Sequence, residues 1–166
     1  TLLPALLAGN AVVFKPSEHA PRAGALVASL FEDLVPTGTV ERLEGDGAIG
    51  AKLVRSDVDG VVFTGSVAVG REIAVACAER LVVCSMELGG KDAAVVLADA
   101  PIERTARGLV WGAFTNAGQN CASIERAYVV RSAAEPLLAR IDAIVKELDP
   151  ERDLGSMTTA AQAATV

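Results

Sequence analysis

Short runs of strand-forming residues alternate with amphipathic helical segments along this chain, and that alternation limits the folds it can adopt. Ala11-Val12-Val13-Phe14 is followed by a helical stripe from Pro21 to Leu34. The order then recurs, with expected strands at residues 39–43, 58–63, 81–86, 93–97 and 126–130 and expected helices at 48–55, 67–80, 101–114 and 132–148. We therefore predict an α/β fold with mostly parallel strands.

Local signals predict where some of these elements begin and end. The first ten residues resemble the end of a helix with a Gly9-Asn10 stop, and there is no initiator Met, so we expect the chain to be cut from a longer protein. Ser132-Ala133-Ala134-Glu135 has the form of a capping box. Leu88-Gly89-Gly90 is the expected hinge between domains at 1–86 and 87–166.

The composition excludes several classes of protein. The 166 residues include 15 Lys and Arg against 21 Asp and Glu, a net charge of −6, which argues against nucleic acid or an anionic membrane as partner. No apolar run approaches the roughly 20 residues of a spanning helix. Three cysteines without C-x-x-C spacing indicate a reducing compartment, taken as the cytoplasm. A single histidine, His19, gives no metal site and is expected on the surface.

Four polar or glycine-rich clusters follow expected strands, where parallel sheets bind ligands. They are Lys15-Pro16-Ser17-Glu18, Gly45-Asp46-Gly47, Thr64-Gly65-Ser66 and Glu87-Leu88-Gly89-Gly90. This distribution predicts a nucleotide site. The G-x-G-x-x-G spacing from Gly45 to Gly50 fits such a site or a plain glycine-rich turn. Ser66 could sit at a phosphate-binding helix start or simply cap the helix.

The cysteines differ in their surroundings. Cys77 and Cys84 lie among apolar residues and are interpreted as small buried hydrophobes. Cys121 lies in Gly118-Gln119-Asn120-Cys121-Ala122-Ser123, whose polar groups suit a reactive thiol that needs a base. Glu87 is the acid most expected to be partly buried and to act as that base, the alternative being an exposed glutamate at a strand end.

Four ordered segments resemble signatures of the NAD(P)-dependent aldehyde dehydrogenase superfamily. They are residues 8–18, Phe63-Thr64-Gly65-Ser66, Met86-Glu87-Leu88-Gly89-Gly90-Lys91 and Gly118-Gln119-Asn120-Cys121. The 34-residue interval from Glu87 to Cys121 (121 minus 87) also fits that family. The resemblance implies the end of an atypical Rossmann-like cofactor domain running into the start of an α/β catalytic domain.

The resemblance also implies roles for individual residues. Cys121 would attack an aldehyde, and Glu87 would activate the water that hydrolyses the thioester, in contrast to CoA-acylating relatives. The cofactor would be NAD, with NADP disfavoured by a carboxylate beside the ribose. Its expected contacts are Lys15 and Glu18 at the adenosine ribose, Gly47 at adenine, Gly65 and Ser66 at the pyrophosphate with Gly70 in the helix behind, and the Leu88 backbone at nicotinamide.

Parts of the family pattern are missing. The oxyanion-hole asparagine would precede Thr1, and a Glu-x-Phe-Gly-Pro segment would follow Val166. We therefore expect an internal fragment, inactive alone, of a homo-oligomeric enzyme. The alternative is a non-catalytic nucleotide-binding remnant of the same fold. Trp111 and Phe114 are interpreted as core residues, with the lining of an aldehyde tunnel as the alternative.

Overall fold

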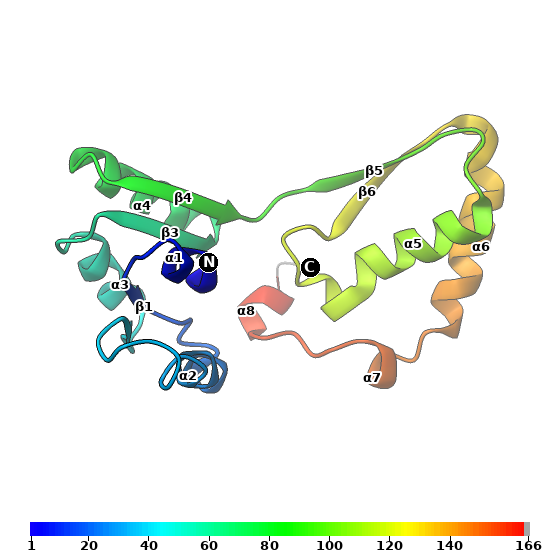
Figure 1. The fold of residues 1–166 in the computed structure, drawn as a ribbon. Coiled ribbons are helices and arrows are strands. Elements are labelled where there is room, and N and C mark those ends of the chain that lie inside the picture. The colour runs from blue at the N-terminus through cyan, green and yellow to red at the C-terminus, as the bar shows by residue number, and fades with distance from the viewer. Residues whose placement is uncertain (165–166) are drawn as a thin grey trace. The chain divides into compact units, whose positions relative to one another are not determined.

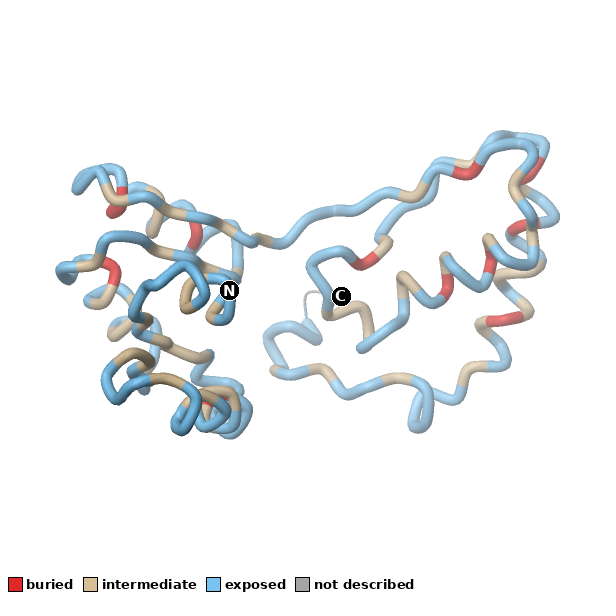
Figure 2. Tube along the Cα trace, viewed as in Figure 1, coloured by how far each residue is buried: buried red, intermediate tan, exposed pale blue. Residues whose placement is uncertain are grey.

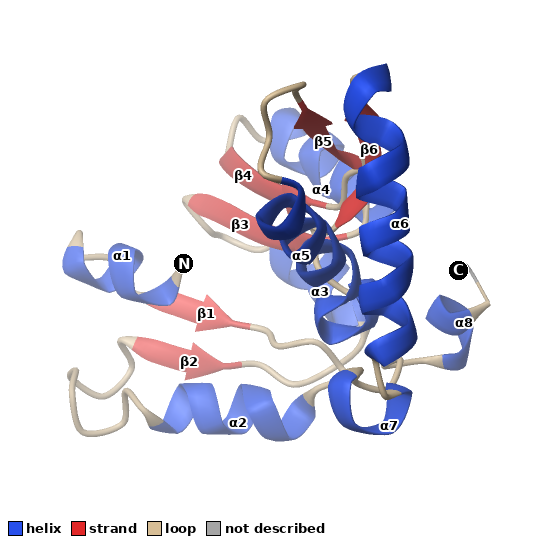
Figure 3. Ribbon diagram, turned by 90° about the vertical axis from the view of Figure 1, so that its right-hand side faces the viewer, coloured by secondary structure: helices blue, strands red, loops and turns tan. Residues whose placement is uncertain are grey.

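Each strand in residues 1–164, which the computed structural model describes, pairs in parallel with one neighbour in the sequence (Figure 1). β1 (Val12–Phe14) pairs with β2 (Val40–Arg42), and α2 (Pro21–Ser29) lies between them in the chain. A parallel pair needs a long crossover, which is usually a helix. Figure 3 shows β1 and β2 side by side and pointing the same way.

The contacts between residues divide the chain into two compact units, residues 1–88 and 89–166. The division falls two residues after the expected boundary between 86 and 87. The first unit holds β1, β2 and α2, and a second parallel pair of strands. Its remaining elements are α1 (Leu2–Leu7), α3 (Gly47–Val54), β3 (Gly60–Gly65), α4 (Val67–Glu79) and β4 (Val83–Leu88). In the register of β3 and β4, Thr64 lies opposite Glu87 and Gly65 lies opposite Leu88.

The second unit contains the third parallel pair and two long helices packed on each other. Its elements are β5 (Asp92–Val96), α5 (Ile102–Phe114), the 3₁₀ turn η1 (Thr115–Gly118), β6 (Ile124–Val129), α6 (Arg131–Glu147), α7 (Pro150–Asp153) and α8 (Ala160–Ala163). The predicted α/β class with parallel strands is confirmed.

Each unit has its own small apolar core (Figure 2). In the second unit, Leu137 of α6 is 1% exposed and packs with Val110 of α5 and Val96 of β5. In the first unit, Cys77 is fully buried beside Ala76 and Val54, as predicted for that cysteine. No helix within residues 1–164 combines the length and the apolar character that crossing a bilayer requires.

Charged side chains link α5 and α6 at the surface. Glu103 of α5 accepts hydrogen bonds from Arg140 of α6 and from Arg107, one turn along its own helix. These bonds, first that from Arg140, lower the pKa of Glu103 to about 2. The carboxylate is exposed, so solvent screens the ion pairs, and the apolar contacts of Leu137 contribute most to the packing of the two helices.

Several predicted boundaries are confirmed. α1 ends before Gly9, whose φ of 84° places it in the left-handed region, as the Gly-Asn stop predicted. Pro21 is the first residue of α2.

Other boundaries are wrong. α2 ends at Ser29 instead of Leu34, because tight turns replace the helix there: Phe31 N donates to Ala28 O at 3.0 Å. β4 starts at Val83, after Leu81 takes a φ of 57°. Ser132 does not cap α6, because that helix already starts at Arg131 after Val130.

Leu137 and its neighbour Leu138 offer a matched test of the second core. Leu137 is 1% exposed and Leu138 is 64% exposed on the same helix. Leu137→Ala removes buried methyl groups and leaves a cavity, so we expect a loss of about 2–5 kcal/mol in unfolding free energy. Leu138→Ala should change it by less than about 0.5 kcal/mol. Urea denaturation of the two variants measures both values, and equal losses would contradict the assigned core.

Candidate functional site

The loop that follows β1 is tied to the loop that follows β2. The Lys15 ammonium donates to Pro16 O and to Gly45 O, both at 2.8 Å, and lies 3.6 Å from a carboxylate oxygen of Glu18. A hydrogen bond from the backbone N–H of Glu18, aided by the Lys15 charge, lowers the pKa of the Glu18 carboxyl. Glu18 is therefore a carboxylate at the surface of this loop.

A hollow of about 260 Å³ lies between these two loops. Its lining residues are Pro16, Ser17, Glu18, Pro21, Glu44, Gly45 and Asp46. Gly47 is the first residue of α3, directly after Asp46, and a side-chain carbon added to it would meet no atom within 4 Å. The structure thus brings Lys15, Glu18 and the segment before Gly47 together.

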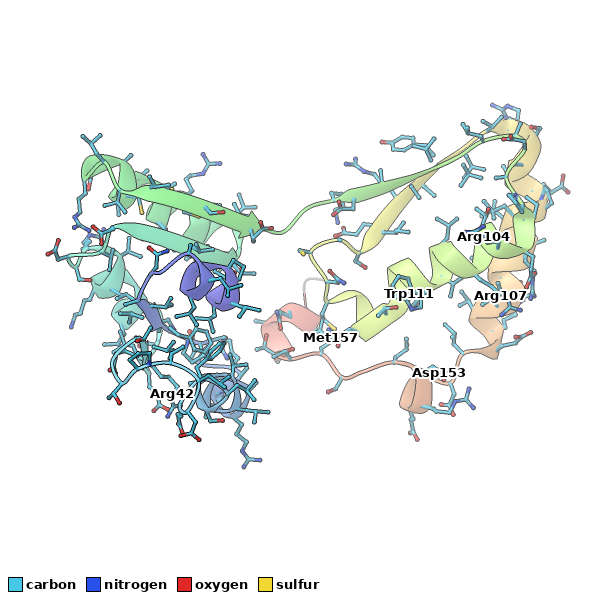
Figure 4. The ribbon with its side chains drawn as sticks, in the orientation of Figure 1. Arg42, Arg104, Arg107, Trp111, Asp153 and Met157 are labelled. Carbon is cyan, nitrogen blue, oxygen red and sulfur yellow. The ribbon has the colours of Figure 1, made fainter. Side chains whose placement is uncertain are left out.

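Glu44 was not singled out from the sequence, and Asp46 was noted only as part of the Gly45-Asp46-Gly47 cluster. Asp46 caps α3 by accepting hydrogen bonds from Ala48 N at 3.0 Å and Ile49 N at 3.3 Å. An aspartate directly before a helix is a recognisable capping signal, so its position could have been found. Glu44 pairs with Arg42, which is labelled in Figure 4, and no local pattern marks it.

A larger hollow, of about 550 Å³, lies between α2 and β2 and contains none of the expected cofactor residues. Its lining includes Leu26, Glu32 and Glu41. The smaller hollow is the better candidate, because it lies where the loops after two parallel strands meet.

The turn after β3 has the geometry of a helix start. Ser66 Oγ accepts a hydrogen bond from Val69 N at 3.3 Å, so Ser66 caps α4. A side-chain carbon at Gly65 would collide with the Phe63 ring, and one at Gly70 would lie 2.6 Å from Leu88 Cδ2. The two glycines therefore permit a tight turn and close packing of α4 on β4, which places Gly70 against Leu88.

Glu87 is exposed, so the expectation that it is partly buried is wrong. Burial alternates along β4, and Glu87 falls on the exposed face between Met86 and Leu88, which are half-buried. A strand covered on one face alone places successive side chains alternately inside and outside.

Cys121 is exposed, Cys84 is half-buried and Cys77 is buried. The Cys121 thiol lies 3.7 Å from Asn120 Oδ1, which also accepts a hydrogen bond from Ala122 N at 3.0 Å. A side-chain carbon added to Gly90 would lie 3.7 Å from Cys121 O, so the segment after β4 passes beside the cysteine backbone. Of the three thiols, that of Cys121 is the most accessible to a reactant.

Two aromatic residues differ from their expected positions. Trp111, which is labelled in Figure 4, is 72% exposed. Phe114 is 37% exposed, so the interpretation of both as core residues is wrong. Trp111 lies off the α5 face that carries Ala106 and Val110, and Phe114 is the last residue of that helix. His19 is exposed, as predicted. In residues 1–164, no three His, Cys, Asp or Glu side chains gather as metal ligands.

Sequence comparison identifies relatives across the whole chain. The profile described as "Aldehyde dehydrogenase family" matches residues 1–166. The 4,4'-diapolycopene aldehyde oxidase of Methylomonas sp is 43% identical over 97% of this chain and 31% of its own length. Betaine aldehyde dehydrogenase 1 of Rhizobium meliloti is 43% identical over 96% of this chain and 34% of its own length. The chain thus spans about a third of these curated relatives.

Solved structures share the fold. PnpE, in complex with nicotinamide adenine dinucleotide, superposes with a TM-score of 0.90 at 36% identity. The match covers 98% of this chain and 35% of PnpE.

Gly24 tests how the candidate cofactor loop is held. A methyl group at Gly24 would collide with the Pro16 ring, which cannot rotate away. We expect Gly24→Ala to lower the unfolding free energy by about 1–3 kcal/mol and to displace the loop from Lys15 to Glu18. Gly108→Ala is the control, because Gly108 is also helical and has no atom within 4 Å. Thermal unfolding measures the loss of stability, and titration with NAD measures the effect on the loop. Equal melting temperatures for Gly24→Ala and Gly108→Ala would contradict the close packing of Gly24 on Pro16.

Proposed function

Because the chain belongs to the aldehyde dehydrogenase family, we propose that this protein oxidises an aldehyde to a carboxylic acid with NAD. The observation that carries the proposal is the exposed Cys121 thiol, in a loop of hydrogen-bonding residues, combined with a family match over the full chain. The two regions 1–86 and 87–166 would be parts of the cofactor-binding and catalytic domains.

Cys121 is the proposed nucleophile. Its thiolate adds to the aldehyde carbon, and the oxygen becomes an oxyanion that the Cys121 backbone N–H stabilises. NAD, when bound, supplies the acceptor for the hydride that leaves this carbon. Cys121 then carries a thioester. The exposure of its thiol supports this assignment, since an aldehyde can reach Cys121 and cannot reach the fully buried Cys77.

Glu87 is the proposed general base. Its carboxylate takes a proton from water, the water oxygen attacks the thioester carbonyl, and the acid leaves as the Cys121 thiolate is restored. One observation supports this role: Glu87 is exposed on β4, so its carboxylate is accessible to water.

The residues around the smaller hollow suit the sugar and adenine end of NAD. Glu18, as a carboxylate, can accept hydrogen bonds from both ribose hydroxyls, while Lys15 holds the two loops together. The open backbone at Gly47 leaves room for a flat base. Gly65 and Ser66, with Gly70 behind them, would face the pyrophosphate, and the Leu88 backbone would lie toward nicotinamide.

Negative charge at the hollow favours NAD over NADP. A 2′-phosphate would meet Glu18 and, along the same lining, Glu44 and Asp46. Lys15 pairs with Glu18 and Arg42 pairs with Glu44, so these two cations are already engaged by the glutamates. The bound ligand of PnpE is in keeping with this preference.

Cys121 and Glu87 can be tested separately in the full natural polypeptide that contains these residues. Cys121→Ala should abolish aldehyde-dependent NADH formation. Glu87→Gln should keep a single-turnover burst of NADH and lower the steady rate by about 10²–10⁴-fold, because hydrolysis loses its base. Cys84→Ala is the control and should keep full activity. Stopped-flow absorbance of NADH separates burst from steady rate, and persistent turnover by Cys121→Ala would contradict the mechanism.

Glu18→Gln tests the cofactor preference. Two charges about 4 Å apart in water repel by about 1 kcal/mol, so removing the carboxylate charge should raise kcat/KM for NADP about five- to tenfold. The value for NAD should fall, since the ribose loses its strongest acceptor. Glu41→Gln, at the larger hollow, is the matched control. If Glu41→Gln changes kcat/KM for NADP and Glu18→Gln does not, the proposed cofactor site is wrong and the larger hollow is the better candidate.

A further inference from the structure

The loop before Cys121 has an unfavourable backbone conformation. Asn116, Ala117 and Gly118 have φ angles of 55°, 54° and 73°, so three successive residues adopt the left-handed region. Glycine adopts it readily and asparagine more often than most residues do, but the Cβ of Ala117 disfavours it. Such a turn persists only where surrounding contacts hold it.

The side chain of Gln119 supplies contacts of this kind. Its Nε2 donates to Asn116 O at 3.0 Å and to Ser156 O at 3.1 Å. Its Oε1 accepts from Thr158 N at 2.8 Å and from Thr158 Oγ1 at 2.9 Å. Both donor hydrogens and both acceptor positions of the amide are therefore used. One side chain ties the left-handed turn to a segment almost forty residues further along the chain.

Ser123 anchors the other side of the loop. Ser123 is 4% exposed, and its hydroxyl lies 3.0 Å from Gly112 O and 3.3 Å from Ala113 O, at the last turn of α5. These carbonyls are near the helix end, where acceptors lack partners within the helix. A buried hydroxyl with these acceptors fixes the backbone two residues after Cys121.

Cys121 thus lies midway between two anchored residues, each two positions away. We propose that Gln119 and Ser123 are positioning residues that hold the Cys121 thiol in the orientation needed for attack. This inference rests on the proposed role of Cys121 as the nucleophile. Neither residue reacts. Each restricts the loop, so that a larger share of molecules presents the sulfur in a reactive arrangement.

The test compares variants of the full natural polypeptide. Gln119→Met keeps the length of the side chain and removes all four hydrogen bonds, and Ser123→Ala removes the buried hydroxyl. The matched control is Gln162→Met, since the Gln162 side chain is exposed and hydrogen-bonds only to Thr159 in the described chain. Thr158→Val removes one of the four bonds and serves if Gln119→Met fails to fold.

Two readouts distinguish positioning from mere stability. We expect Gln119→Met and Ser123→Ala to lower kcat about 10- to 100-fold with little change in the KM for aldehyde. Thr158→Val should show a smaller loss and Gln162→Met none. Iodoacetamide alkylates the Cys121 thiol, and peptide mass spectrometry measures the rate of this reaction at each pH. We expect this rate to differ between the unsubstituted polypeptide and the variants Gln119→Met and Ser123→Ala.

Each outcome bears on the inference. If Gln119→Met and Ser123→Ala lower the melting temperature yet keep kcat and the alkylation profile of the parent, the residues are structural only and the inference is wrong. If Cys121→Ala remains active, the proposed function fails. The alkylation profiles then still decide, without reference to turnover, whether Gln119 and Ser123 position Cys121.

Discussion

Parallel pairing of neighbouring strands is the constraint on which the rest of this structure depends. Two parallel strands cannot be joined by a tight turn, so each pair requires a crossover that carries the chain back to the same end. In β1 and β2, and again in β3 and β4, the loops that follow the strands therefore leave from one edge. The hydrogen bond from Lys15 to Gly45 O and the contact of Gly70 with Leu88 both follow from that arrangement.

The candidate cofactor residues and the candidate nucleophile are held in different ways. Lys15, Glu18 and Ser66 lie at strand ends and helix starts, where backbone geometry alone presents them. Cys121 follows a left-handed turn and lies outside the helices and strands. Side chains hold that loop instead, chiefly the amide of Gln119 and the buried hydroxyl of Ser123. A thiol in a loop is more accessible to a reactant than one on a buried helix face. The hydrogen bonds of Gln119 and Ser123 restrict the conformation of this loop, as backbone hydrogen bonds would in a helix.

Much of the fold could be predicted because its signals are local. The strand at β1 and the helix at α4 follow from residue type and apolar spacing, and Ser66 and Gly9 mark a helix start and a helix end by their own conformational preferences. The buried state of Cys77 follows from its apolar neighbours on one helix face. The family resemblance rests on short ordered motifs, which is also why it could be found without a structure.

The sequence by itself determined the α/β class with mostly parallel strands and the segments that carry the candidate residues, because alternating strand and helix signals are local patterns of residue type. Only the tertiary structure decided that Glu87 is exposed, that Gly24 lies against Pro16, that Trp111 is outside the core and that Gln119 reaches Ser156 and Thr158. These features depend on which distant segment packs beside each residue. A local pattern of residues carries no signal of that choice, since the partner is set by the folded backbone.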